Sequence, residues 1–526
     1  LADAIAARKV TAVEAVGSAV ARMRATNDTI NAVVDDLGEA ALREAEAHDK
    51  AMSAGGPVGP LHGVPVTIKE NVDQKGCATP NGVVAFKDVI APDDAPVVHN
   101  LRRAGAIVIG RTNTPEFSFR GTTVNELHGR TFNPWNTTAS AGGSSGGAAA
   151  AVMMGYGPIA HGNDIGGSLR FPAYACGAAT VKPGLGRVPA YNPSAAVERG
   201  MLAQVMSVQG VICREVRDVR LAKRSLIGYD PRDPWQVPMP FEGPAEAKPI
   251  KVAFTRNTFD FALHPAVARA LDTARAALAA AGYEVREVEP PLLKEAAVTG
   301  ARCLFGEAKA LMDADVRKYG SKTVVAIFDG YYRYFQPFEG LEFLKAIADR
   351  DRFIRAWTPF MADYPLVLTP FLPAPIFTWN RDEQGAEGVR EVLGSALYSY
   401  AMNFMGLPAA VVPANENDGQ PVGVQIVGRR FREDMILDAA EVVERAVAVQ
   451  DVEALLRLRG AVVALPAPAQ REAVEAEHVH HPHHGQGHGH QVRTLGHHRT
   501  PEEAAGRGPL DGQLPGIPRH KRLPGR

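Results

Sequence analysis

The sequence predicts an α/β fold in which helices cover a largely buried β-sheet. Two observations support this class. Short runs rich in β-branched residues recur along the chain, and segments with helical periodicity separate them. The chain has 526 residues, 46% hydrophobic and 22% charged, which is the balance of a globular protein with a large core. We therefore expect a sheet buried on both faces.

The first predicted elements are two helices and a strand. TAVE, residues 11–14, has the pattern of a capping box and predicts a helix that reaches about Met23. A second helix is predicted from Gly38 to about Met52. VPVTI, residues 64–68, is β-branched and predicts a strand that ends directly before Lys69.

The next predicted pair is a helix followed by a buried strand. Asp94 is the expected cap of a helix that runs through Arg103, and Gly105 is its expected stop. AIVIG, residues 106–110, is the expected strand. The same alternation returns later, with strands predicted at 251–254, 365–369, 409–413 and 422–428 and helices at 264–282 and 433–449.

The composition changes after about residue 456. The remaining residues are rich in Pro, Gly and His and poor in aromatic side chains, so they cannot bury enough apolar surface to offset the entropy of ordering. We expect a folded domain over 1–455 and a disordered tail over 456–526. Metal binding by the histidines of this tail is an alternative that rests on composition alone.

Charge and cysteine content exclude several functional classes. The net charge of −1 gives no electrostatic argument for a nucleic-acid or membrane partner. No apolar run is long enough to span a bilayer, and the first residues lack the pattern of a signal peptide. Four widely spaced cysteines and the lack of metal motifs predict a cytoplasmic protein without a disulfide framework or a metal.

The first unusual motif is GGSSGG, residues 142–147. A flexible linker is a weak interpretation, because AAAAVMM follows directly and predicts a helix start. A phosphate-binding loop is another, although no GK[ST] closes it. Residues 142–146 also fit GxSxG, the nucleophile elbow of α/β-hydrolases, with Ser144 as nucleophile. That fold needs a strand directly before the serine, and NPWNTTASA predicts none.

The second motif is HGNDIGGSLR, residues 161–170. Gly166 and Gly167 allow the backbone to approach a ligand closely, and successive N–H groups before Ser168 are suited to an oxyanion hole. Asp164 and Arg170 are expected to pair across the turn. A nucleophilic serine needs a base, which a lysine provides when burial keeps it neutral.

Lys69 is the candidate base, because it follows an apolar strand. Three segments in this order, GPLHGVPVTIKENVDQKG, ASAGGSSGGAAAAV and HGNDIGGSLRFPAYACGAATVKPGLGRV, resemble the amidase signature family of hydrolases. The resemblance continues through GRTNTPEFS, HGRTFNPWN, NFMGLPAAVVP and PVGVQIVGRRFREDMIL, and covers about residues 1–450. It implies the amidase signature fold, a large mixed twisted sheet surrounded by helices.

The resemblance also implies a site and a mechanism. Lys69 corresponds to the general base, Ser144 to a bridging serine that follows a cis peptide bond, and Ser168 to the nucleophile. Neutral Lys69 would draw a proton through Ser144 from Ser168, which attacks the amide carbonyl and forms an acyl-enzyme that water hydrolyses. The implied oxyanion-hole donors are the N–H groups of Ile165, Gly166, Gly167 and Ser168, and the implied supporting residues are Ser145, Asp164 and Arg170. No cofactor is implied.

Three positions depart from the family pattern. Asn163 stands where the family often has Thr, His161 replaces an apolar or small residue, and residues 179–184 read ATVKPG in place of a GLKPT segment. We expect His161 to be packed in the core, with a pocket role as the alternative. The aromatic segment 328–338 is expected either to line an acyl pocket or to form helix core, and the same alternatives apply to 376–380.

The expected function is hydrolysis of a small aryl or aliphatic amide to an acid and ammonia or an amine. A homodimer is one assembly that is compatible with the sequence. One alternative is a transamidosome-type subunit that hydrolyses glutamine and passes ammonia to a partner. Another is an esterase of the α/β-hydrolase type with Ser144 as nucleophile. The third alternative is a non-catalytic binding protein. Such a protein would have no use for Lys69, Ser144 and Ser168 together, which argues against it.

Overall fold

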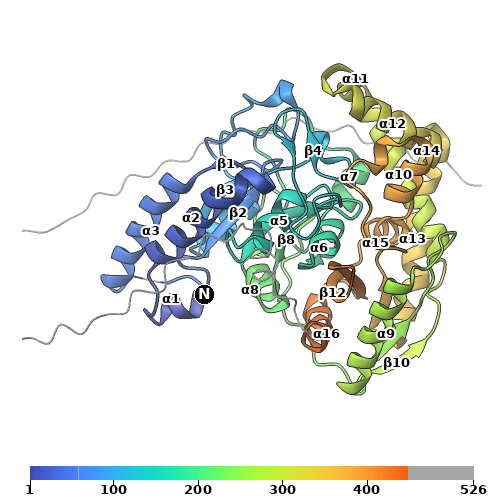
Figure 1. The fold of residues 1–526 in the computed structure, drawn as a ribbon. Coiled ribbons are helices and arrows are strands. Elements are labelled where there is room, and N and C mark those ends of the chain that lie inside the picture. The colour runs from blue at the N-terminus through green and yellow to red at the C-terminus, as the bar shows by residue number, and fades with distance from the viewer. Residues whose placement is uncertain (57, 448–526) are drawn as a thin grey trace, which may run out of the picture. The chain divides into compact units, whose positions relative to one another are not determined.

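The computed structural model describes residues 1–56 and 58–447, and Figure 1 shows the arrangement of its elements. An 11-stranded sheet has the order β1-β3-β2-β6-β8-β7-β12-β13-β11-β9-β10. Its strands are β1 (Val33–Asp36), β2 (Pro65–Lys69), β3 (Ile107–Thr112), β6 (Ile159–Asp164), β7 (Ala179–Lys182), β8 (Val208–Cys213), β9 (Lys251–Phe254), β10 (Glu284–Glu287), β11 (Leu366–Pro370), β12 (Ala409–Asn417) and β13 (Gln420–Gly428). A separate pair is β4 (Val124–Asn125) and β5 (Gly129–Arg130).

Helices surround the sheet, as Figure 1 shows. The α-helices are α1 (Ala2–Ala6), α2 (Ala12–Ile30), α3 (Gly38–Ser53), α4 (Pro96–Arg103), α5 (Gly146–Met153), α6 (Arg170–Cys176), α7 (Met201–Met206), α8 (Val216–Leu226), α9 (Pro265–Ala280), α10 (Leu293–Leu311), α11 (Asp313–Tyr319), α12 (Lys322–Phe335), α13 (Gly340–Asp363), α14 (Gly385–Val389), α15 (Leu397–Met405) and α16 (Glu433–Ala446). A π-helical turn spans Arg390–Gly394.

The sheet is mixed, as the family resemblance implies. β2 is parallel to both β3 and β6, and β9 is parallel to both β10 and β11. The remaining pairs in the sheet are antiparallel. Every residue of β2, β3, β7, β8 and β11 is buried, which confirms the expected sheet with both faces covered.

Most of the predicted elements are present with small shifts in their ends. The capping box of Thr11 and Glu14 opens α2. This helix passes the expected end at Met23, because Thr26 and Ile30 continue its buried face. α9 begins after His264, whose side chain accepts from the Ala266 N–H. The predicted α/β class is therefore confirmed.

The predicted cap of α4 is wrong. Asp94 lies one residue too early, and Ala95 takes the cap position with Pro96 opening the helix. The Asp94 carboxylate instead accepts from the Lys75 N–H at 2.8 Å and pairs with Arg102 at 3.3 Å. Pro at the first helical position needs no capped N–H, so this helix starts without a side-chain cap.

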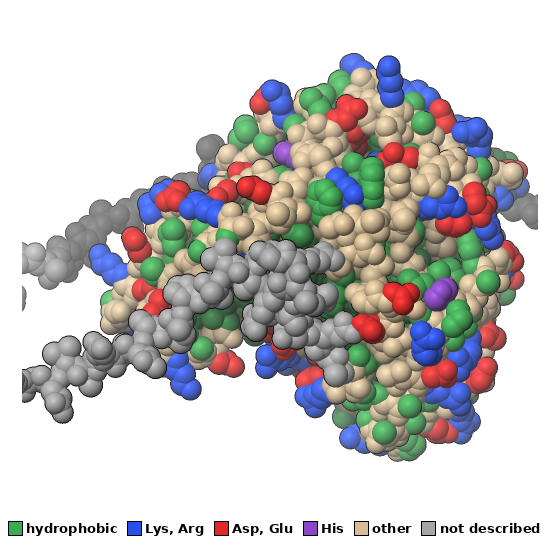
Figure 2. Space-filling model, in the orientation of Figure 1, with side chains coloured by type: hydrophobic (Ala, Val, Ile, Leu, Met, Phe, Trp, Pro, Cys, Tyr) green, Lys and Arg blue, Asp and Glu red, His purple; other side chains and the backbone are tan. Residues whose placement is uncertain are grey.

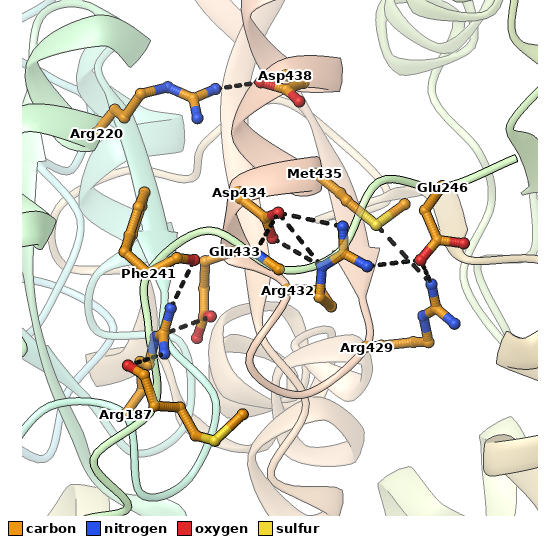
Figure 3. A network of polar contacts seen from close by, with 12 residues as sticks. Arg187, Arg220, Phe241, Glu246, Arg429, Arg432, Glu433, Asp434, Met435 and Asp438 are labelled. Atoms are coloured by element: carbon orange, nitrogen blue, oxygen red, sulfur yellow. Dashed lines mark hydrogen bonds and ion pairs between the residues drawn. The ribbon is translucent and has the colours of Figure 1, made fainter. Parts of the chain in front are cut away.

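A polar network fixes the start of α16 and the loops around it (Figure 3). Arg432 binds both Asp434 and Glu246, and Glu246 also binds Arg429. Arg187 lies 3.3 Å from Glu433, and neither side chain of this pair is exposed. Glu433 also accepts from the Gly184 N–H at 2.9 Å. The loop after β7 is therefore attached to α16 by buried charges.

On the face shown in Figure 2, acidic and basic side chains are interspersed. This mixture agrees with the formal net charge of −1. The predicted tail, 456–526, and the predicted domain end at 455 lie outside the described residues.

Candidate active site

Lys69 is the last residue of β2, and its side chain has no exposed surface. Its Nζ lies 2.7 Å from the Oγ of Ser144. Burial removes water from the ammonium group and lowers the pKa of Lys69 well below 10.5, although Asp164 and Glu70 act in the opposite direction. The neutral amine is therefore favoured, as general-base chemistry requires.

Ser144 lies in the loop that leads into α5, and the helix start predicted after this loop is confirmed. The Gly143–Ser144 peptide bond is cis, as the family resemblance implies. The glycines of this loop permit a close approach: Gly142 has φ of 75°, and a Cβ there would lie 2.6 Å from the Pro172 backbone. Ser145 is buried, and its hydroxyl donates to the Asn163 carbonyl at 3.4 Å.

Ser168 lies in the loop between β6 and α6 and is half-buried. It lines a cavity together with Ile165, Gly166 and Gly143, the residue that precedes Ser144. The two glycine-flanked serine loops therefore meet at one cavity. Lys69, Ser144 and Ser168 come from three separate segments. The parallel pairing of β2 with β6 brings the segments of Lys69 and Ser168 together, and the Lys69–Ser144 contact adds the third.

The Ser168 loop is fixed by a buried ion pair. Arg170 donates to both carboxylate oxygens of Asp164 at 3.0 Å, and neither side chain is exposed, so the expected pairing is confirmed. Burial alone would raise the pKa of Asp164, but the adjacent Arg170 outweighs it and lowers the pKa to about 2. Asn403 also donates to the Asp164 carboxylate, at 3.0 Å.

In the loop that carries Ser168, one backbone N–H group is bonded to Asp164, whereas other residues line the cavity. The Gly167 N–H donates to the Asp164 carboxylate at 2.8 Å, so it can serve an oxyanion only as a shared donor. Ile165 and Gly166 line the cavity itself. Gly167 has φ of 113°, and a Cβ there would lie 2.7 Å from both Phe171 and Ser399, so this position requires glycine.

The cavity beside Ser168 is largely apolar and aromatic. It contains about 330 Å³ of atom-free space, part of it open to solvent. Its other lining residues are Ser118, Phe119, Arg120, Phe171, Leu304, Phe305, Leu393 and Tyr400. None of these lining residues comes from segments 328–338 or 376–380. Segment 328–338 packs behind the cavity instead, where Phe335 stacks on Phe305 with ring centroids 4.1 Å apart.

Arg120 is the cation among the residues that line the cavity, and two carboxylates pair with it. Arg120 donates to both carboxylate oxygens of Asp382, at 2.9 and 2.7 Å, and to Glu383 at 2.8 Å. Arg120 and Asp382 are buried. Burial alone would lower the pKa of Arg120, but the pair with Asp382 raises it, so the guanidinium stays charged. The positive charge of Arg120 is therefore already compensated, and the cluster of Arg120, Asp382 and Glu383 offers no free cation to a substrate.

Asn163 is the neighbour of Lys69 whose contact the sequence did not reveal. Its amide oxygen accepts from Lys69 Nζ at 2.9 Å, and its amide nitrogen donates to Asn71 at 2.9 Å. The departure from the family pattern at residue 163 was the available signal. His161, the other departure, lies in the core and contacts Gln209 at 2.9 Å. Burial lowers its pKa to about 3, so it is neutral.

The nucleophile-elbow interpretation does not fit this geometry. In the described chain, no strand leads into Ser144, because β5 ends at Arg130 and α5 follows the serine loop. A nucleophile elbow also needs a later histidine, and the histidines that follow Ser144 in the described chain are His161 and His264. Both have other partners, His161 with Gln209 and His264 as the cap of α9. The side chain that contacts Ser144 is that of Lys69.

Metal ligands and membrane spans are both absent from the described part of the chain. Residues 1–56 and 58–447 hold no group of three or more His, Cys, Asp or Glu side chains able to bind a metal ion. Over the same residues, no helix has the length and apolar character needed to cross a membrane.

The chain matches a protein family and several known proteins. The sequence model of the family described as Amidase matches residues 14–437. The chain is 49% identical over 449 residues to an indoleacetamide hydrolase of Bradyrhizobium diazoefficiens, covering 85% of this chain and 86% of the relative. It is 30% identical over 475 residues to a glutamyl-tRNA(Gln) amidotransferase subunit of Moorella thermoacetica, covering 85% and 95%.

A solved structure shares the fold. A bacterial aryl acylamidase of the amidase signature family superposes with a TM-score of 0.75 and 27% identity, covering 86% of this chain and 97% of that one. The similarity to the amidotransferase is more distant than that to the indoleacetamide hydrolase. The chain therefore belongs to the amidase signature family and is an enzyme that hydrolyses the C–N bond of amides.

Proposed function

We propose that the enzyme hydrolyses a neutral arylacetamide, with indole-3-acetamide as the first candidate, to the acid and ammonia. The observation that carries the proposal is the 2.7 Å contact between Lys69 and Ser144, beside a cavity that Ser168 shares with aromatic side chains. The similarity to an indoleacetamide hydrolase supports the choice of acyl group.

In the proposed mechanism, neutral Lys69 accepts the proton of Ser144 as Ser144 accepts the proton of Ser168. The Ser168 oxygen attacks the amide carbonyl, and the N–H groups of Ile165, Gly166 and Ser168 receive the developing oxyanion, with Gly167 as a shared donor. The proton returns through Ser144 to the leaving nitrogen, which departs as ammonia. Water then repeats the path and releases the acid.

The proposed substrate class follows from the cavity. Phe119, Phe171, Phe305 and Tyr400 offer ring contacts to an aryl group, and such contacts contribute about 0.5–1.5 kcal/mol each beyond burial. Glutamine fits this wall poorly, because its α-carboxylate needs a free cation and Arg120 is already paired with two carboxylates. We therefore favour a neutral acyl group over glutamine.

We also propose a cytoplasmic location and no requirement for a protein partner. All four cysteines are free thiols, and three of them are buried, which suits a reducing compartment.

Ammonia release from indole-3-acetamide, phenylacetamide, propionamide and glutamine tests the proposal, with Ser168→Ala as control. We expect the arylacetamides to give the highest kcat/KM and Ser168→Ala to give none. Glutamine as the best substrate would favour the amidotransferase-type alternative. Turnover of aryl esters without turnover of any amide would contradict the proposed reaction.

A further inference from the structure

Asn163 contacts the proposed base directly. It lies on β6 and is half-buried. Its Oδ1 accepts a hydrogen bond from Lys69 Nζ at 2.9 Å, while Ser144 Oγ lies 2.7 Å from the same nitrogen. The lysine nitrogen is thus held between one hydroxyl and one amide oxygen.

Hydrogen bonds on the side away from Lys69 fix the orientation of the Asn163 amide. Its nitrogen donates to Asn71 Oδ1 at 2.9 Å, and the nitrogen of Asn71 donates to Ser118 Oγ at 2.9 Å. The side chain of Asn192 in turn donates to the backbone carbonyl of Asn71 at 3.2 Å. Asn71 Oδ1 accepts from the Asn163 nitrogen, so the Asn163 oxygen is left to face the lysine. The Asn71 nitrogen also donates to this oxygen, at 3.3 Å.

This arrangement limits the directions in which the amine lone pair can point. A neutral lysine has two N–H donors and one lone pair, and the lone pair must face Ser144 to accept its proton. An amide oxygen only accepts, so it takes an N–H and leaves the lone pair for Ser144. A threonine hydroxyl, which many members of the resembled family have at this position, both donates and accepts, so it does not enforce the choice.

We infer that Asn163 is a positioning residue, which holds one N–H of Lys69 so that the lone pair of the amine faces Ser144. The inference rests on the proposed role of Lys69 as the general base. The Asn163–Asn71–Ser118 chain of hydrogen bonds extends from this base to Ser118 on the wall of the substrate cavity.

The other ionisable groups around Lys69 have partners of their own. Asp164 is paired with Arg170, and Glu70 lies 2.9 Å from His128. Asp164 and Glu70 both raise the pKa of Lys69. Lys69 in turn contributes to lowering the pKa of His161. A new carboxylate at residue 163 would contact Lys69 Nζ directly and would stabilise its ammonium form.

The test is the pH profile of kcat/KM on indole-3-acetamide, or on the best amide of the panel, for wild type and three variants. In Asn163→Asp, we expect the acid limb to move up by about one pH unit or more, with activity at pH 7 reduced about tenfold or more and partly restored at high pH. In Asn163→Leu, the plateau should fall without an upward shift of the limb. Asn163→Thr should retain more of the plateau than Asn163→Leu.

His161→Gln is the matched control, because it changes a buried polar side chain on the same strand that bonds to Gln209 and not to Lys69. We expect its acid limb to coincide with that of wild type. An acid limb of Asn163→Asp that also coincides with wild type would overturn the inference. So would a Leu variant with the full wild-type plateau.

Failure of the inference can be told apart from failure of the proposed mechanism. Lys69→Arg and Ser168→Ala, assayed in parallel, must both be inactive if Lys69 and Ser168 act as proposed. If they are inactive and the Asn163 profiles do not change, only the positioning role is wrong. If either one keeps wild-type activity, the base or nucleophile assignment itself is wrong.

Discussion

Lys69 Nζ lies 2.7 Å from Ser144 Oγ, and the two side chains are 0% and 1% exposed. Without water, the lysine is disfavoured as a cation and available as a base. The contact thus joins the buried end of β2 to the serine loop before α5. Catalysis should depend on this contact and on the loop that carries Ser168.

Activity should depend on pH through Lys69. Protonation as pH falls removes the base, so kcat/KM should decline on the acid side and level off above the lowered pKa of Lys69. Lys69→Arg should be inactive at every pH, because a guanidinium stays charged. A profile without an acid limb in wild type would contradict a lysine base.

The lowered pKa of Lys69 should also make the stability of the fold depend on pH. Between the lowered pKa of folded Lys69 and its ordinary value of 10.5, the unfolded chain binds a proton that the folded chain does not. The free energy of unfolding should therefore rise with pH in this window. Urea unfolding at several pH values should show the rise for wild type relative to Lys69→Met. Parallel curves for the two proteins would mean that folded Lys69 remains protonated.

Alanine substitutions of the three serines should reduce activity to different extents. Ser168→Ala should lose on the order of 10⁴-fold or more in kcat, and Ser144→Ala should also lose most of it. Ser145→Ala, in the same loop as Ser144, should lose less, because its hydroxyl makes only a 3.4 Å contact with the Asn163 carbonyl. Steady-state ammonia release measures the ranking. A Ser145 variant as inactive as that of Ser168 would require a different role for Ser145.

Removing one partner of the buried ion pair should destabilise the fold. Asp164→Asn leaves the Arg170 charge unpaired, and we expect a loss of about 3–5 kcal/mol in urea unfolding at neutral pH. Because the pKa of Asp164 is lowered to about 2, its contribution is present above 3.8 and lost as pH falls through about 2. The exposed pair of Asp351 and Arg355 is the control, where Asp351→Asn should cost less than about 1 kcal/mol. Equal losses would contradict this account.

Two adjacent glycines should respond differently to alanine. Gly167→Ala should nearly abolish activity, since its backbone has φ of 113° and the new Cβ would meet Phe171 and Ser399 at 2.7 Å. At Gly166 the nearest atom would be 3.2 Å away, on the Tyr400 ring, so Gly166→Ala should be milder in kcat and in melting temperature. The reverse order would contradict the loop geometry.

An aromatic wall should confer selectivity for aryl groups. Phe305→Ala should lower kcat/KM for indole-3-acetamide by about 10- to 100-fold and for propionamide much less. Phe353, a buried ring that packs on Phe404 away from the cavity lining, provides a control for general loss of core packing. Phe353→Ala should affect both substrates equally. An equal effect of Phe305→Ala on both substrates would remove Phe305 from the substrate site.

Local patterns predicted the elements with strong periodicity. β9 was predicted with its observed ends, because KVAF is a short buried run. The helix predicted over 264–282, which ends at a glycine, is present as α9 over Pro265–Ala280. β6 was missed, because its HGND sequence is polar and carries a glycine. The structure shows why such a sequence forms a strand here: the strand is paired on both sides, by β2 and β8.

Pairings between distant residues could not be read from the chain. The contact of Arg120 with Asp382 and Glu383 joins segments that no local pattern connects. The aromatic segment 328–338 was equally compatible with pocket wall and helix core, and only the packing of Phe335 on Phe305 places it behind the cavity. Lys69 and the two serines were predicted from motifs, whereas the Asn163–Asn71 contact depends on tertiary structure.

The central claim is that Ser168, and not Ser144, forms the covalent bond to the acyl group. The most direct test is labelling with phenylmethanesulfonyl fluoride, followed by proteolysis and tandem mass spectrometry to locate the adduct. We predict one adduct on Ser168, absent from Ser168→Ala and strongly slowed in Lys69→Arg. An adduct on Ser144 in wild type, formed equally fast in both variants, would contradict this account.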